Sequence, residues 1–208
     1  MDITLIAIIL ATVLFSYKGF NDSLFFRKFQ FHIGNIQSGE QIRMISSGFL
    51  HADLGHLFFN MFTLYMFAPV VINYFGEFSF VLIYMFSLIF GSLFTLLMHK
   101  NDYSYTAIGA SGAVTGIIYS AILIQPNLEI YGFIPGYLFG VSYLLYSIYG
   151  MKAKNDNIGH TAHFGGAIGG YLITIVKEPI MLTENTFMVV LLAIPIIILF
   201  VMSKMGKL

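Results

Sequence analysis

One stretch in the last quarter of the chain combines histidine with closely spaced glycines. It reads Gly159-His160-Thr161-Ala162-His163-Phe164-Gly165-Gly166-Ala167-Ile168-Gly169-Gly170 and opens an apolar run that extends to Val176. On a helix, His163, Gly166 and Gly170 fall on one face. Glycines on such a face let a second helix approach closely. The stretch therefore predicts a membrane-spanning helix that packs tightly against a partner and carries an imidazole on the packing face.

A second run of small residues opens an earlier apolar segment. It reads Gly109-Ala110-Ser111-Gly112-Ala113-Val114-Thr115-Gly116. By themselves its glycines predict only a close-packed helix face, and Ser111 alone is more often a packing residue than a nucleophile. If this face meets the later glycine face, Ser111 and His163 come within hydrogen-bond reach. Because a histidine near neutral pH can accept a serine proton, the pair predicts a Ser–His dyad without an intramembrane carboxylate to orient the imidazole.

A third polar cluster lies at the start of another apolar run. It reads His51-Ala52-Asp53-Leu54-Gly55-His56-Leu57-Phe58-Phe59-Asn60. His56 and Asn60 are four residues apart, so a helix places both on one face. Such a pair can form hydrogen bonds between helices, which is the simpler interpretation, or it can stabilise an oxyanion beside the dyad.

The composition indicates a membrane protein. The 208 residues are 58% hydrophobic and only 10% charged, with a mean hydropathy of +0.83, whereas soluble domains carry about 25% charged residues. The formal net charge is zero, which disfavours nucleic acid as a partner. The absence of Cys excludes disulfides, thiolate metal sites and a cysteine nucleophile.

Runs of apolar residues predict an all-α polytopic membrane helix bundle with seven spans. The predicted spans are Ile3–Phe20, Leu54–Phe75, Phe78–Met98, Ala107–Ile124, Tyr131–Tyr149, Thr161–Val176 and Phe187–Met202. The long connection over residues 21–50 mixes charged and aromatic residues, so we expect it to be partly folded and to lie at the membrane interface.

With these three clusters in this order, the chain resembles the rhomboid family of intramembrane serine proteases. The resemblance runs from Arg43 to Gly170 and implies a rhomboid six-helix core, residues 1–180, with an extra C-terminal transmembrane helix over residues 181–208. It implies Ser111 as nucleophile and His163 as base. It implies the Ser111 N–H, His56 and Asn60 as oxyanion donors. It implies structural roles near the site for His51, Arg43, Gly109, Gly112, Gly166 and Gly170.

The function that the resemblance implies is hydrolysis of a peptide bond in or near a transmembrane segment of a substrate protein, within the lipid membrane, with no cofactor and no metal. A non-catalytic relative that binds transmembrane clients is the alternative, and a small transporter or channel is a third. The spans carry neither a His-Glu-x-x-His metalloprotease motif nor a pair of aspartates.

Three positions depart from the family pattern. Ile42 stands where tryptophan is common, and Ile72 stands where an acidic residue is expected. Thr115 replaces an aromatic ring that stacks on the base in many members, so the His163 imidazole needs another orienting contact.

Two lines of reasoning disagree on the orientation of the chain in the membrane. The resemblance implies a plasma or inner membrane with the site opening to the non-cytoplasmic side, although the lysine and arginine distribution favours the reverse orientation.

Overall fold

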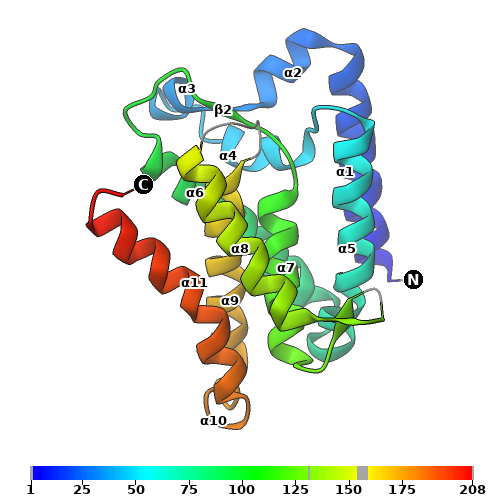
Figure 1. The fold of residues 1–208 in the computed structure, drawn as a ribbon. Coiled ribbons are helices and arrows are strands. Elements are labelled where there is room, and N and C mark those ends of the chain that lie inside the picture. The colour runs from blue at the N-terminus through cyan, green and yellow to red at the C-terminus, as the bar shows by residue number, and fades with distance from the viewer. Residues whose placement is uncertain (1, 131, 154–158, 208) are drawn as a thin grey trace.

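A computed structural model describes residues 2–130, 132–153 and 159–207, and these are mostly helical (Figure 1). In chain order the elements are α1 (Ile3–Asn21), α2 (Ser23–Phe29), β1 (Phe31–His32), α3 (Ile33–Gln37), α4 (Arg43–Ser46), the 3₁₀ turn η1 (Ser47–Phe49), α5 (Leu54–Phe75), α6 (Glu77–Met98), β2 (Thr106–Ala107), α7 (Ser111–Ile124), β3 (Glu129–Ile130), β4 (Ile134–Pro135), α8 (Gly136–Ala153), α9 (His160–Lys177), α10 (Met181–Glu184) and α11 (Thr186–Lys204).

Each of the seven predicted spans overlaps one helix, in chain order α1, α5, α6, α7, α8, α9 and α11. Within the described residues, α1, α5, α6 and α11 are long and apolar enough to cross a membrane by length and composition. Helix α7 is apolar but has only 14 residues. Helices α8 and α9 have 18 residues each, and their glycine and polar residues lower their hydropathy. The architecture is that of a polytopic helical membrane bundle.

Two predicted span starts are wrong, and the structure gives the reasons. Helix α7 begins at Ser111 rather than at Ala107, because the strand pair β1–β2 uses the backbone at Ala107 and Gly109 has φ +117°, outside the helical region. Helix α8 begins at Gly136 rather than at 131, because β3 and β4 form a hairpin before it.

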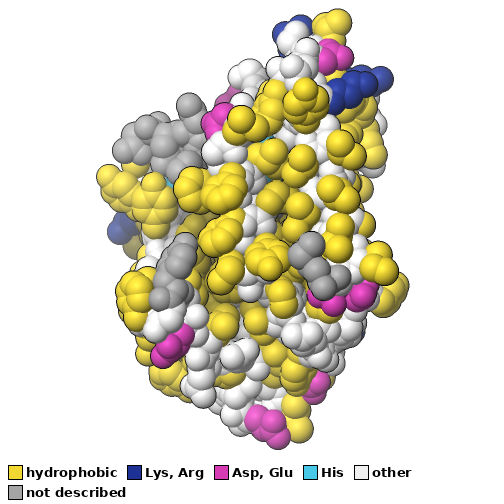
Figure 2. All heavy atoms as spheres, turned by 90° about the vertical axis from the view of Figure 1, so that its right-hand side faces the viewer, with side chains coloured by type: hydrophobic (Ala, Val, Ile, Leu, Met, Phe, Trp, Pro, Cys, Tyr) yellow, Lys and Arg dark blue, Asp and Glu magenta, His cyan; other side chains and the backbone are white. Residues whose placement is uncertain are grey.

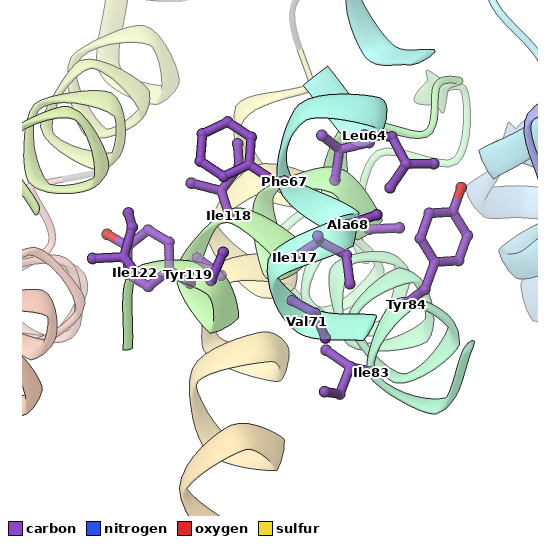
Figure 3. Packing of buried hydrophobic residues seen from close by; sticks show 14 of the residues in the cluster. Leu64, Phe67, Ala68, Val71, Ile83, Tyr84, Ile117, Ile118, Tyr119 and Ile122 are labelled. Carbon is purple, nitrogen blue, oxygen red and sulfur yellow. The ribbon is translucent and has the colours of Figure 1, made fainter. Parts of the chain in front are cut away.

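Helix α7 lies at the centre of the bundle. Every residue from Gly112 to Leu123 is buried, and α7 packs against α5, α6 and α9. Figure 3 shows part of this core, with Ile117 and Ile118 of α7 beside residues of α5 and α6. At about 1.5 Å per residue, α7 is about 12 Å shorter than α5. In the view of Figure 1, α7 begins below the level at which α5 begins, so the N-terminal end of α7 lies inside the bundle.

Helix α9 is wedged between α6 and α7 by two glycine faces. A Cβ atom on Gly166 or Gly170 would overlap a backbone carbonyl of α7, that of Gly112 or Gly116 respectively. On the other face, a Cβ on Gly165 would lie 2.7 Å from the carbonyl oxygen of Phe90 on α6. The predicted contact between the two glycine stripes is confirmed, and it brings the start of α9 to the start of α7.

The long first connection is folded, as predicted, and it holds the segment that leads into α7. Phe31 and His32 of β1 pair with Ala107 and Thr106 of β2. The N–H of Gly109 donates to the carbonyl of Ser47 at 3.0 Å. The connection lies across the end of the bundle where α7 begins (Figure 1).

Charged side chains concentrate at the two ends of the bundle. Figure 2 shows one face on which hydrophobic side chains cover much of the middle, with most of its Lys and Arg side chains in the upper part. Lys18, Lys152 and Lys204 lie in the last turns of α1, α8 and α11, at the end that carries the first connection, whereas Lys177 ends α9 at the opposite end.

Candidate active site

Ser111 and His163 are joined by a hydrogen bond. Ser111 is the first residue of α7 and His163 lies in the first turn of α9. The distance between Ser111 Oγ and His163 Nε2 is 2.7 Å, and His163 is 5% exposed. The glycine contact between α7 and α9 therefore places a hydroxyl against an imidazole, the arrangement required for proton transfer from a serine nucleophile.

A cavity of about 830 Å³ adjoins this pair. It is lined by residues of α2, α5, α7, α8 and α9, by residues that flank α2, α5 and α9, and by the segment before α7. These are Phe26, Gln30, Ala52, Asp53, His56, Phe59, Asn60, Thr63, Tyr105, Thr106, Ala107, Ile108, Ser111, Val114, Thr115, Ile118, Phe139, Tyr143, Gly159 and His163. The lining combines aromatic and aliphatic side chains with a few polar groups around Ser111, which is typical of a site that binds an apolar ligand in one orientation.

His56 and Asn60 line this cavity on one face of α5. The Ala52 N–H donates to His56 Nδ1 at 3.5 Å, which leaves the proton of a neutral imidazole on Nε2. Asn60 Nδ2 donates one hydrogen to the His56 carbonyl at 2.9 Å and retains a second. Both side chains therefore have a donor available in the cavity that Ser111 also lines.

Gly109 packs closely against the His56 imidazole, near Ser111. A Cβ atom at Gly109 would lie 2.9 Å from His56 Nε2 and 3.7 Å from Ser111 Oγ. Its φ of +117° also disfavours any other residue. A side chain at position 109 would therefore displace the His56 imidazole, so glycine lets this ring lie next to the segment that leads into Ser111.

His51 lies outside the cavity lining and connects three elements. The Ser16 hydroxyl donates to the Phe49 carbonyl at 2.8 Å, so its oxygen accepts from His51 Nδ1–H at 2.9 Å. His51 Nε2 then accepts the Ala110 N–H at 3.3 Å. Burial lowers the pKa of His51 to about 3. A neutral imidazole therefore ties α1 to the residue that precedes Ser111.

Arg43 acts at a greater distance from the dyad. It is 6% exposed and donates to the carbonyls of Arg27 and Gln30 at 2.7 and 3.0 Å. Its Nε also donates to Glu40 at 2.7 Å, which holds the pKa of that carboxyl below its usual value. Arg43 thus fixes the end of α2, from which Phe26 and Gln30 reach the cavity.

One residue in contact with His163 has no distinguishing signal in the sequence. Tyr143 of α8 has its hydroxyl 3.0 Å from His163 Nδ1. Four tyrosines occur on α8, and no motif distinguishes Tyr143 from Tyr137, Tyr146 or Tyr149. Only the packing of α8 against α9 identifies it.

Fold and site together define a multi-pass integral membrane protein with a serine and a histidine paired inside a helical bundle. The family model described as Rhomboid domain matches residues 38–179. The chain belongs to the rhomboid family, which includes proteases.

Relatives with similar sequences include proteins of a plant and of a bacterium. The chain is 31% identical over 176 residues to the "RHOMBOID-like protein 12, mitochondrial" of Arabidopsis thaliana. The aligned region covers 76% of this chain and 52% of that protein. It is 32% identical over 141 residues to the "Putative rhomboid protease YdcA" of Bacillus subtilis, covering 67% and 68% of the two chains. It is 29% identical over 136 residues to the "Rhomboid protease GluP" of Bacillus subtilis, covering 65% and 26%. The chain thus spans about half the length of the first relative.

Proposed function

We propose that this chain is an intramembrane serine endopeptidase that hydrolyses a peptide bond in or near the transmembrane segment of a membrane-protein substrate, with Ser111 and His163 as its catalytic dyad. The hydrogen bond between Ser111 Oγ and His163 Nε2 beside a largely apolar cavity is the observation that supports this most. Membership of a family with members named as proteases supports the reaction class.

In the proposed reaction, Ser111 Oγ attacks the scissile carbonyl carbon while His163 Nε2 accepts the hydroxyl proton. The tetrahedral intermediate then collapses, and the imidazolium returns that proton to the leaving amine. Water next attacks the acyl-enzyme and gives its proton to His163. The imidazolium protonates Ser111 Oγ as the ester bond breaks, which releases the acid and restores the dyad.

Three donors are proposed for the oxyanion of the two intermediates. They are the Ser111 backbone N–H in the first turn of α7, the Nε2–H of His56 and the second Nδ2 hydrogen of Asn60. The position of His56 and Asn60 in the lining of the cavity that adjoins Ser111 supports this, because each of these side chains has a donor available there.

We also propose residues 1–180 as the catalytic core and residues 181–208, which contain α11, as an addition to it. The proposed location is a plasma or inner membrane with the site opening to the non-cytoplasmic side. The proposed substrates are transmembrane proteins, and the chemistry described needs no cofactor.

The test is cleavage of a fluorescent transmembrane peptide by the purified protein in detergent, together with labelling by a fluorophosphonate, which reacts with activated serines. Ser111→Ala and His163→Ala should each abolish cleavage and labelling while keeping the gel-filtration profile of the parent. Ser203→Ala, a serine exposed near the end of α11, serves as the matched control and should behave as the parent.

Full cleavage by Ser111→Ala would refute the dyad. A parent protein that binds the peptide without cleaving it, and does not react with the fluorophosphonate, would instead favour the non-catalytic client-binding alternative.

A further inference from the structure

The second ring nitrogen of His163 has a specific partner on another helix. The Tyr143 hydroxyl lies 3.0 Å from His163 Nδ1, and the two rings stack with centroids 5.3 Å apart and planes 29° from parallel. One side chain of α8 therefore restrains both the tilt of the imidazole and its rotation about the Cβ–Cγ bond.

The direction of these hydrogen bonds follows from what a dyad requires. For the Ser111 hydroxyl to donate to Nε2, a neutral His163 must carry its proton on Nδ1. That Nδ1–H then donates to the Tyr143 oxygen. When Nε2 accepts the serine proton, the Nδ1–H bond to Tyr143 persists, so both N–H groups of the imidazolium keep a partner.

Thr115 makes room for the tyrosine ring. It lies one turn after Ser111, is 1% exposed, and donates to the Ser111 carbonyl at 2.6 Å. Its hydroxyl also interacts with the Tyr143 side chain. An aromatic ring at position 115 would compete with Tyr143 for the space beside His163, so the small residue on α7 and the tyrosine on α8 form a complementary pair.

Helix α8 is itself held by its neighbours. The Tyr119 hydroxyl of α7 donates to the Gly140 carbonyl at 3.0 Å. A Cβ atom at Gly140 would lie 3.0 Å from Ile122 of α7 and 3.3 Å from Leu192 of α11. The position of Tyr143 therefore depends on α8 remaining packed between α7 and α11.

We propose that Tyr143 is the positioning residue of the dyad: it holds His163 in the Nδ1–H tautomer and makes a productive Ser111–His163 geometry conditional on the packing of α8. This inference rests on the proposed proteolytic function. Tyr143 keeps its own hydroxyl proton throughout and supplies no formal charge, so its contribution is that of a neutral hydrogen bond and a stacked ring.

The first test compares Tyr143→Phe, which keeps the ring and removes the hydroxyl, with Tyr149→Phe, an exposed tyrosine on the same helix. Tyr143→Phe should lower kcat roughly 2- to 10-fold, the rate equivalent of one neutral hydrogen bond, and leave KM unchanged. Tyr149→Phe should change neither. A rise in KM alone would make Tyr143 a substrate contact and would overturn the proposal.

The second test transfers the tyrosine ring from position 143 on α8 to position 115 on α7. Tyr143→Ala should lose more activity than Tyr143→Phe, and the double variant Thr115→Tyr/Tyr143→Ala should recover part of it. If the double variant folds as the parent does but recovers no cleavage activity, residues 115 and 143 are not a complementary pair.

The third test does not depend on turnover. In protein with ¹⁵N-labelled histidine, the His163 signals, assigned by their loss in His163→Ala, should show a protonated Nδ1 in the parent and a larger Nε2–H population in Tyr143→Phe. An Nε2–H tautomer in the parent would overturn the proposal. A parent with the expected tautomer but no cleavage or fluorophosphonate labelling would instead overturn the proposed function and leave this contact intact.

Discussion

Two histidines near the cavity, His51 and His56, carry their ring proton on different nitrogens, because different ring nitrogens accept a backbone N–H. His51 carries its proton on Nδ1, because its Nε2 accepts the Ala110 N–H. His56 carries its proton on Nε2, because its Nδ1 accepts the Ala52 N–H. At the scale of single residues, the backbone partner thus decides what each imidazole does. His51 accepts a hydrogen bond from the backbone before Ser111, whereas His56 has an N–H donor available in the cavity.

We predict that the stability of the folded protein depends on pH through the protonation of His51. The pKa of this buried imidazole is lowered to about 3 from its usual 6.5, so the unfolded chain binds a proton that the folded chain excludes between those values. The stabilising contribution is complete above pH 6.5 and is lost as the pH falls toward 3. The thermal midpoint of the parent should fall more steeply over pH 7 to 5 than that of His51→Gln, which cannot titrate. If the thermal midpoints of the parent and of His51→Gln fall equally with pH, this prediction is wrong.

For the proposed oxyanion donors, we predict an effect on kcat more than on KM. An important single donor is worth about 2.7–4 kcal/mol of transition-state stabilisation, and three donors provide redundancy. His56→Ala and Asn60→Ala should each reduce kcat by roughly tenfold or more. Steady-state cleavage of the transmembrane peptide checks this prediction. If both variants change only KM, the pair binds substrate or supports the helix.

At the scale of elements, the contact between α7 and α9 determines whether the dyad can form. The carbonyls of Gly112 and Gly116 occupy the space into which side chains on Gly166 and Gly170 would project. The two helix backbones are therefore as close as glycine allows, and the Ser111–His163 distance depends on that closeness.

We predict that Gly166→Val lowers activity and stability together. The added side chain must push α9 away from the Gly112 carbonyl, which typically costs about 1–3 kcal/mol, and a displacement of about 1 Å at the dyad can reduce the rate about 100-fold. Thermal midpoint and cleavage rate should be measured on the same preparation. Ile197→Val on α11, where Ile197 is 58% exposed, is the control and should change neither. A fully active Gly166→Val would show that the dyad does not depend on this contact.

At the scale of the whole molecule, charge is distributed unevenly between the two ends. The end that carries the first connection and the start of α7 also carries Lys18, Lys152 and Lys204. The opposite end carries Glu77, which opens α6, and Lys177 and Glu184, which lie in the last turns of α9 and α10. The positive-inside rule alone would place the first connection in the cytoplasm, whereas the proposed orientation places it outside.

Single cysteines can decide this orientation, because the chain has none of its own. We predict that Ser38→Cys, exposed in the first connection, reacts with a membrane-impermeant maleimide in intact cells. Thr183→Cys, exposed on α10, should react only after the cells are permeabilised. The parent chain is the unlabelled control. The reverse pattern would place the site on the cytoplasmic side.

Much of the molecule could be predicted from local sequence. Apolar runs identified the seven longest helices of the described residues, because helices of a membrane bundle are built from runs of up to about 20 apolar residues. The spacing of Gly112, Gly116, Gly166 and Gly170 predicted which two helices meet, because glycine is the residue that allows backbones to touch. That contact in turn predicted the approach of Ser111 to His163, now found at 2.7 Å.

What the sequence could not determine depends on residues brought together from distant helices. The start of α7 was misplaced because the pairing of β2 with β1 joins positions about 75 residues apart, and strand pairs of two residues carry no periodicity. Tyr143 is one of four tyrosines on α8, and only the tertiary packing of α8 places it rather than another against His163. Local sequence thus predicted the helices and the pairing of Ser111 with His163, whereas the contact between Tyr143 and His163 follows from how three helices pack, which no local pattern encodes.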